Sequence, residues 1–243
     1  MEYRANFFMW IFLSAIWVIV QVGFVGIYFL FTDNVAGWTK PQFFLLIGLF
    51  RAIEGIYHVF FHQNLMNFPE NITSGNFDLY ITRPVNSLFL ISTRYHSLDE
   101  LGTFIIGLGL VFYALVQLHL TISLLIMIKI LIMIFFGTIA LYSIMLILSS
   151  LSFYLTRMTA LFSIWDVISK ALRVPINIIT RDNFLGNALL FPLLIVVTIP
   201  SKIIFGPTYL RQIIIEIIGS VSLVILAYRF FYSCLRRYSS ASS

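Results

Sequence analysis

The chain has 243 residues, of which 60% are hydrophobic, 17% are aromatic and only 10% are charged. Soluble proteins carry about 25% charged residues, so this composition excludes a water-soluble domain. The net charge of +5 does not indicate nucleic-acid binding, because the basic residues are scattered at the ends of apolar segments. The single cysteine, Cys234, excludes an internal disulfide bond.

Long stretches of the chain contain no Asp, Glu, Lys or Arg. These stretches are residues 5–32, 101–128, 130–156 and 183–201. A helix needs about 20 apolar residues to cross a hydrocarbon core of about 30 Å, and a charge at its centre costs roughly 2.5 to 3.5 kcal/mol. The sequence therefore predicts an all-α polytopic membrane protein with one transmembrane domain over residues 1–243.

In chain order, six apolar segments are predicted to span the membrane. The first two are separated by turn signals at Gly37 and Pro41. The third and fourth are joined by so few residues that we expect an antiparallel hairpin. The expected spans are about 6–31, 42–61, 98–117, 121–153, 159–180 and 208–232.

The longest polar interval, about residues 63–97, is predicted to lie outside the bilayer. Within it, Pro69 is expected to open a short helix, and Gly75 is expected to end that helix at its C′ position. Asp78 and Arg83 then frame a turn that Pro84 ends. A compact capped helix at the membrane surface favours docking of a soluble protein over a solvated connector.

Residues 183–207 are apolar but are interrupted by glycine and proline, including Gly186, Pro192 and Pro200. Lipid cannot satisfy the backbone groups that such residues free, so a broken helix needs protein or water around it. We therefore predict a re-entrant helical hairpin before the last span, or a kinked segment covered by protein. If this segment crossed the membrane instead, the count of spans would be seven, but six is preferred.

Six spans place both termini on one side of the membrane, and the distribution of basic residues indicates which side this is. The positive-inside rule puts the termini and the 63–97 loop in the cytoplasm. The basic residues predicted on this face are Arg4, Arg83, Arg94, Arg157, Arg229, Arg236 and Arg237, against Lys40, Arg181, Lys202 and Arg211 on the other.

Two predicted spans carry charges inside the membrane. Arg51 and Glu54 are three residues apart and share a helical face, and Asp166 and Lys170 are four apart, with Arg173 close behind. Charges at this depth face a cavity or one another. A structural ion pair and a contact with cargo are both open.

The sequence offers little for catalysis. It contains no phosphate-binding Gly-x-x-x-x-Gly-Lys-Ser/Thr loop, so the chain cannot bind and hydrolyse ATP in the usual way by itself, and it contains no Gly-x-Ser-x-Gly motif. His58 and His62 have the spacing of metal ligands but lack a third ligand nearby. We therefore predict no metal site and no catalytic residues.

An ordered set of short motifs resembles the ABC-2 type permease family, in particular its six-helix branch with a separate ATPase subunit. The motifs run over nearly the whole chain. They are Tyr3-Arg4-Ala5-Asn6, Gly37-Trp38, Ile72-x-x-Gly75-x-x-Asp78-x-x-x-x-Arg83-Pro84 and Pro175-x-x-Ile178.

This resemblance implies an exporter in the plasma or inner membrane, built from two permease chains and two ATP-binding subunits that hold ATP and Mg. It implies that the 63–97 loop carries the coupling helix. The residues that the resemblance places at or just after the ATPase contact are Ile72, Gly75, Asp78, Arg83 and Pro84. Only four residues precede the first apolar run, so the amphipathic N-terminal helix common in the family is expected to be shortened or absent.

Two other functions remain open from the residues alone. A gradient-driven transporter or channel would use the intramembrane charges as a relay, and a lipid-modifying membrane enzyme would need clustered acids. The sequence leaves open the cargo and whether the second permease is a copy of this chain. The direction of transport rests on the resemblance.

Overall fold

The computed structural model describes residues 2–154, 159–180, 183–206 and 210–238, and the described part contains helices and no strand. Arg157, Arg181 and Pro207, which entered the topology and hairpin predictions, lie outside these residues. So do the side chains of Tyr3, Arg4 and Asn6.

Five helices of the described part are long and apolar enough to cross a membrane. They are α1 (Glu2–Tyr28), the continuous helix Lys40–Thr73, the helix Leu98–Gln117, the helix Leu124–Phe153 and α13 (Leu210–Leu235). The all-α polytopic fold is thereby confirmed. The predicted fifth span is divided into α8 (Thr159–Ala171) and α9 (Ile176–Thr180), so the count of six stays a prediction.

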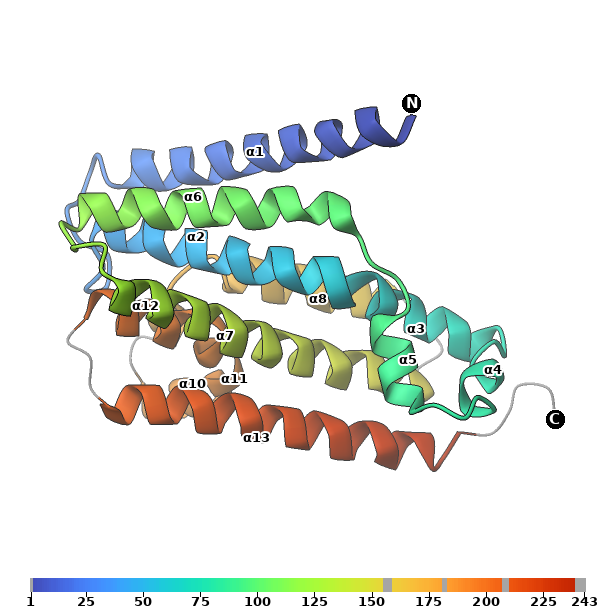
Figure 1. Cartoon of the computed structure of the whole chain (residues 1–243). Coiled ribbons are helices and arrows are strands. Elements are labelled where there is room, and N and C mark those ends of the chain that lie inside the picture. The colour runs from blue at the N-terminus through green and yellow to red at the C-terminus, as the bar shows by residue number, and fades with distance from the viewer. Residues whose placement is uncertain (1, 155–158, 181–182, 207–209, 239–243) are drawn as a thin grey trace.

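The long helices lie side by side in the order α1, α6 (Leu101–Gln117), α2 (Lys40–Tyr57), α7 (Leu124–Ser150) and α13 (Figure 1). α1 begins and α13 ends at the same end of the bundle (Figure 1). We call this end, which also carries residues 74–97, the loop end. α6 and α7 run antiparallel and are joined by a short connection, as predicted, and α2 lies between them in the row of helices (Figure 1).

α2 and α6 approach closely because glycines face the partner backbone. A Cβ on Gly55 would lie 2.5 Å from the backbone nitrogen of Phe104, and one on Gly107 would lie 2.5 Å from that of Ala52. Small residues permit such contact where lipid supplies no hydrophobic drive between helices. The pairing also sets depth: Ala52 lies beside the second turn of α6, about 9 Å from the start of that helix.

The described part of the predicted re-entrant segment, residues 183–206, forms short helices at the end opposite the loop end (Figure 1). These are α10 (Phe184–Leu189), α11 (Phe191–Leu193), the π-helix η4 (Leu194–Thr198) and α12 (Ile199–Phe205). The longest continuous helix of this segment, Phe191–Phe205, has 15 residues and is about 22 Å long. It is too short to cross a hydrocarbon core of about 30 Å. The re-entrant hairpin stays a prediction.

The loop end contains α3 (Gln63–Thr73), α4 (Asp78–Ile81), α5 (Ser87–Thr93) and the 3-10 helix η2 (Leu98–Glu100). The prediction that Pro69 opens a helix is wrong, because Pro69 lies inside α3, which continues α2 without a break. Lys40–Thr73 has 34 residues, about 51 Å of helix, so it extends well beyond a core of about 30 Å.

Pro69 is tolerated because another helix replaces its missing hydrogen bond. A proline at position 69 leaves the carbonyl of Leu65 without its helical donor. The hydroxyl of Ser149, on α7, donates to that carbonyl at 3.1 Å, and both residues are buried. The interruption therefore ties α3 to the end of α7.

Ser149→Ala is expected to lower the free energy of unfolding by about 1 to 3 kcal/mol, because it leaves a buried carbonyl unpaired. Adding Pro69→Ala should recover most of the loss, since it restores an N–H for Leu65. Thermal unfolding of the detergent-purified chain measures both changes.

Ser143→Ala is the matched control. The Ser143 hydroxyl is also buried in α7, but it donates to the carbonyl of Ile139 within the same helix, so its loss should cost less than that of Ser149. Equal costs for the two serines, with no recovery in the double variant, would contradict this account of Pro69.

Candidate functional site

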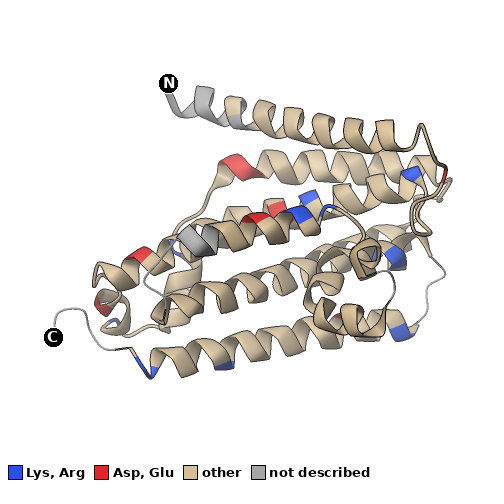
Figure 2. Cartoon of the chain, turned by 180° about the vertical axis from the view of Figure 1, so that it is seen from behind, with Lys and Arg blue, Asp and Glu red and all other residues tan. Residues whose placement is uncertain are grey.

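Two groups of residues stand out: a polar cavity inside the bundle and a helical element built on the loop end. Figure 2 shows a group of charged residues on α8 and α2 in the middle of the bundle, with most others near its two ends. The cavity contains the predicted intramembrane charges, and the loop end contains the predicted coupling residues.

A cavity of about 550 Å³ lies between α1, α2, α8 and the start of α6. All five predicted intramembrane charges line it, although they come from segments more than 100 positions apart. We call it the charged cavity. The ionisable residues that line it are Arg51, Glu54, His58, Glu100, Asp166, Lys170 and Arg173.

The centre of the cavity is a carboxylate shared by two guanidinium groups. Glu54 Oε2 accepts from Arg51 at 2.8 Å, as their spacing predicts, and Glu54 Oε1 lies 3.9 Å from Arg173. Arg51 and Glu54 are buried, whereas the Arg173 side chain is 31% exposed. Arg51 also donates to Gln21 of α1 at 3.1 Å. The contact with Arg173 was outside the reach of spacing arguments, because it joins separate helices.

The remaining acids of the cavity are paired as well. Asp166 forms an ion pair with Lys170 at an exposed position. Glu100 lies 3.5 Å from Nδ1 of His58 and accepts from Thr103 at 3.0 Å. Each carboxylate that lines the cavity therefore has a partner.

His58 and His62 stack on each other with ring centroids 4.1 Å apart, and Trp165 of α8 packs against both. Among the described residues, no group of three or more His, Cys, Asp or Glu could hold a metal ion. The contacts with Trp165 pack α8 against the π-helix η1 (His58–His62).

Backbone carbonyls of the π-helix accept hydrogen bonds from Asn64 of α3 and from the chain after α5. The carbonyl of Val59 accepts from the N–H of Ser97 at 3.0 Å. The amide of Asn64 donates to the carbonyls of Phe60 and Tyr95 and accepts from the N–H of Tyr95. Residues 95–97 are thereby fixed to the helix that carries the cavity charges.

The turn after α3 is anchored by an aromatic cluster. Gly75 has φ +75° and lies directly after the C-cap Ser74, as the predicted C′ position requires. Phe77 is fully buried, with ring centroids 5.5 Å from those of both Phe68 and Phe153. Phe231 of α13 packs on the same group.

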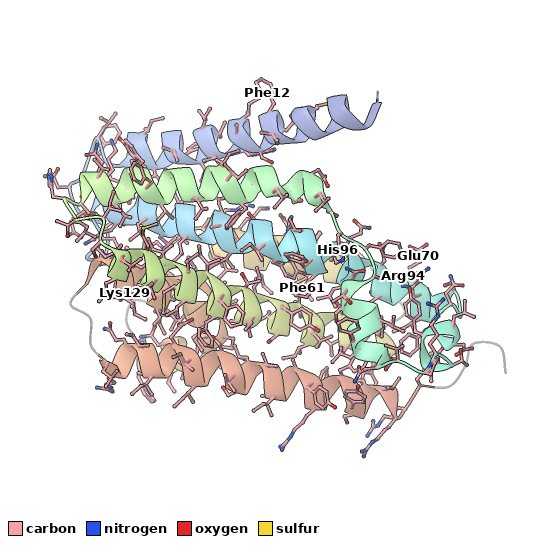
Figure 3. The ribbon with its side chains drawn as sticks, viewed as in Figure 1. Phe12, Phe61, Glu70, Arg94, His96 and Lys129 are labelled. Carbon is pink, nitrogen blue, oxygen red and sulfur yellow. The ribbon has the colours of Figure 1, made fainter. Side chains whose placement is uncertain are left out.

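α4 is held against α5 by Arg94, which lies at the loop end together with Glu70 and His96 (Figure 3). Its guanidinium donates to the hydroxyl of Tyr80 at 2.7 Å and lies 5.4 Å from that ring. This hydrogen bond raises the pKa of Arg94. The contact joins two short helices whose own hydrogen bonds would not hold them.

The five predicted coupling residues are brought to the loop end but differ in exposure. Arg83 and Pro84 are exposed, Gly75 and Asp78 are half-buried, and Ile72 is only 9% exposed and packs in the core. Sequence analysis did not single out the exposed apolar side chains beside them. These are Leu79 (63% exposed), Ile81, Val85 and Phe89, which we call the tip surface.

One further acid was not singled out by sequence analysis. Glu216 lies inside α13 and is fully buried, with Ser220 one turn further along the helix. It does not line the charged cavity. Its position inside the predicted span 208–232 could have marked it as a further intramembrane acid.

These features define a polytopic helical membrane protein with a polar cavity between its helices and a rigid helical element at one end. A family model described as ABC-2 family transporter protein matches residues 5–242. The chain belongs to this family, so it is a membrane transport protein and a component that is not itself catalytic. Searches of curated proteins and of solved structures found no match.

Exchange of the two central charges should restore only part of the stability that either single reversal removes. In Arg51→Glu/Glu54→Arg, the pair is re-formed, but the guanidinium introduced at position 54 faces Arg173, a like charge. Adding Arg173→Glu should raise the melting temperature further, as measured by thermal unfolding in neutral detergent. Full recovery in the double variant would show that Arg173 contributes nothing to the cluster.

Proposed function

We propose that the chain is the membrane-spanning permease subunit of an ATP-binding cassette exporter. A separate ATPase subunit binds and hydrolyses ATP with Mg, and a second permease chain, either a copy or a paralogue, completes the transporter. The protein lies in the plasma or inner membrane of the cell, and its loop end and both termini face the cytoplasm. The family supports the transport role, and the loop end supports the ATPase partner.

The observation that carries the proposal is the tip surface. Its side chains are apolar and exposed, although they lie beyond the end of a helix that already exceeds the hydrocarbon thickness. Exposed apolar groups with a charged neighbour, here Arg83, are typical of a protein interface. A soluble subunit that covers Leu79, Ile81 and Val85 would remove them from water.

The loop end is rigid enough to transmit a displacement. Force on α4 reaches α3 through Phe77 and reaches α5 through Arg94. α3 continues into α2 as one helix, so movement of the tip turns or shifts the segment that carries Arg51 and Glu54. α8 carries the opposing residues of the cavity, and rigid-body movement between these helices is a standard form of alternating access.

A gradient-driven transporter is the second candidate, and the charged cavity is the observation that favours it. Its charges could relay ions, and transport would then need no ATPase. A lipid-modifying enzyme would need clustered acids that are free for catalysis. In the cavity each carboxylate is paired instead.

Leu79→Asp should release the ATPase subunit, because it places a charge in the proposed apolar contact. We expect affinity to fall at least tenfold, corresponding to loss of one buried leucine. The measurement is recovery of the ATPase with the tagged chain from its native membrane in mild detergent, followed by mass spectrometry.

Leu79→Met is the matched control and should retain the ATPase, because it keeps an apolar side chain of similar volume. Recovery of the wild-type chain alone, still moving cargo in vesicles without ATP, would reject the ATP-driven function in favour of the gradient-driven one.

Gly75→Val should weaken coupling while the permease and the ATPase remain associated. A β-branched residue at φ +75° costs at least about 1 to 2 kcal/mol, which shifts the population of the intact turn by about 5- to 30-fold. Cargo-stimulated ATP hydrolysis and ATP-driven transport in proteoliposomes should both fall by a comparable factor.

Gly75→Asn should behave almost as wild type, since Asn adopts the left-handed conformation readily. Normal transport and ATPase stimulation in Gly75→Val would count against a coupling role for this turn.

A further inference from the structure

The charges of the cavity are unevenly satisfied, and this points to the chemistry of its occupant. A cationic ligand would find each lining carboxylate already paired, Glu54 with two guanidinium groups, Asp166 with Lys170, and Glu100 with His58 and Thr103. The donors, in contrast, exceed the acceptors at the centre of the cavity.

Two guanidinium groups, those of the buried Arg51 and the partly exposed Arg173, face the single carboxylate of Glu54, so two cations meet one anion at this point of the cavity. Arg51 is 8% exposed, and its Nε has no hydrogen-bond partner among the described residues. The same holds for Nε of Arg173. A guanidinium offers five N–H donors in a fork that fits carboxylate and phosphate oxygens. The centre of the cavity therefore suits an oxygen anion.

The rest of the wall is apolar and aromatic. Leu13 and Trp17 of α1 and Trp165 of α8 line the cavity beside the charges. Most of α1 is exposed in the described structure, with Trp17 63% exposed, so this side of the cavity adjoins lipid in a membrane. A volume of about 550 Å³ lies within the range of small-molecule sites.

The depth of the cavity also suits a group that enters from the bilayer surface. Ala52 lies beside Gly107, about 9 Å from the loop end of α6, so the charges lie in the half of the membrane nearer the loop end. A lipid-like head group at the surface of that leaflet would reach the charges by moving inward along the helices by about two helical turns, or about 10 Å.

We propose that the charged cavity binds the anionic head of an amphiphile. A carboxylate or phosphate monoester lies between Arg51 and Arg173, and its alkyl chain leaves past Trp17 toward lipid. This deepens the proposed function by naming the class of cargo, and it rests on that function only in treating the bound molecule as cargo. Binding itself requires no ATPase.

The test is binding of defined probes to the full chain, purified in a neutral detergent, by native mass spectrometry. Decyl phosphate is the anionic amphiphile, decyl maltoside carries the same chain on a neutral head, and inorganic phosphate supplies the anion without a chain. We expect saturable binding of decyl phosphate at least tenfold tighter than that of decyl maltoside, with little competition from equimolar inorganic phosphate.

Arg173→Gln should weaken decyl phosphate binding by about 10- to 100-fold, the range for one charged hydrogen bond, and should leave decyl maltoside unchanged. Arg211→Gln, on α13 and outside the cavity, removes the same charge and should have no effect. Glu54→Gln removes the competing carboxylate and should tighten decyl phosphate binding. Arg173→Lys keeps the charge and serves as the conservative variant if Arg173→Gln does not fold.

Equal binding of decyl phosphate and decyl maltoside, or no loss in Arg173→Gln, would overturn the proposal. Equal competition by inorganic phosphate would assign the site to a free anion and overturn the amphiphile. These outcomes are independent of whether Leu79→Asp releases an ATPase, so failure of the cargo class and failure of the transporter assembly are distinguishable.

Discussion

The structure depends on how the backbone hydrogen bonds of the helix Lys40–Thr73 are satisfied. Lipid offers no partner to a freed carbonyl, yet this helix contains both a π-helix and an internal proline. Each interruption finds a hydrogen-bond donor: the N–H of Ser97 binds the carbonyl of Val59, the amide of Asn64 in the same long helix binds that of Phe60, and Ser149 of α7 binds the carbonyl freed by Pro69. The irregular positions thus become the points at which the helix is joined to its surroundings.

Those joints have a mechanical consequence. A regular helix would leave residues 74–97 joined to it only by the covalent connection after Thr73 and by side-chain packing. Here the N–H of Ser97 is bonded to Val59 of the π-helix, directly after His58 at the edge of the charged cavity, and the backbone of Tyr95 is bonded to Asn64 of α3. α3, α5 and the end of α7 therefore respond together to a contact at the tip surface, and the response arrives where α2 faces α8.

The sequence predicted those features that local chemistry determines. Uninterrupted apolar stretches define the long helices, Gly75 takes the left-handed C′ position, and Arg51 pairs with Glu54 because three residues separate them on one helix. It failed where the partner is distant in the chain. Pro69 signals the start of a helix unless Ser149, 80 positions away, replaces its bond. Arg173 likewise reaches Glu54 only through the packing of α8 on α2.

The third charge at Glu54 also bears on the choice between a structural and a functional account of the cluster, and it supports the proposed anion site. Arg51 and Glu54 alone would form a neutral pair, which satisfies the need to compensate charge inside a membrane. Arg173, whose side chain is 31% exposed, adds a cation that this pair does not require, and its partial burial has a desolvation cost. The cost falls if a mobile anion occupies the cavity for part of the transport cycle. Because the open wall along α1 faces lipid, the bilayer itself is a source of such anions at high local concentration.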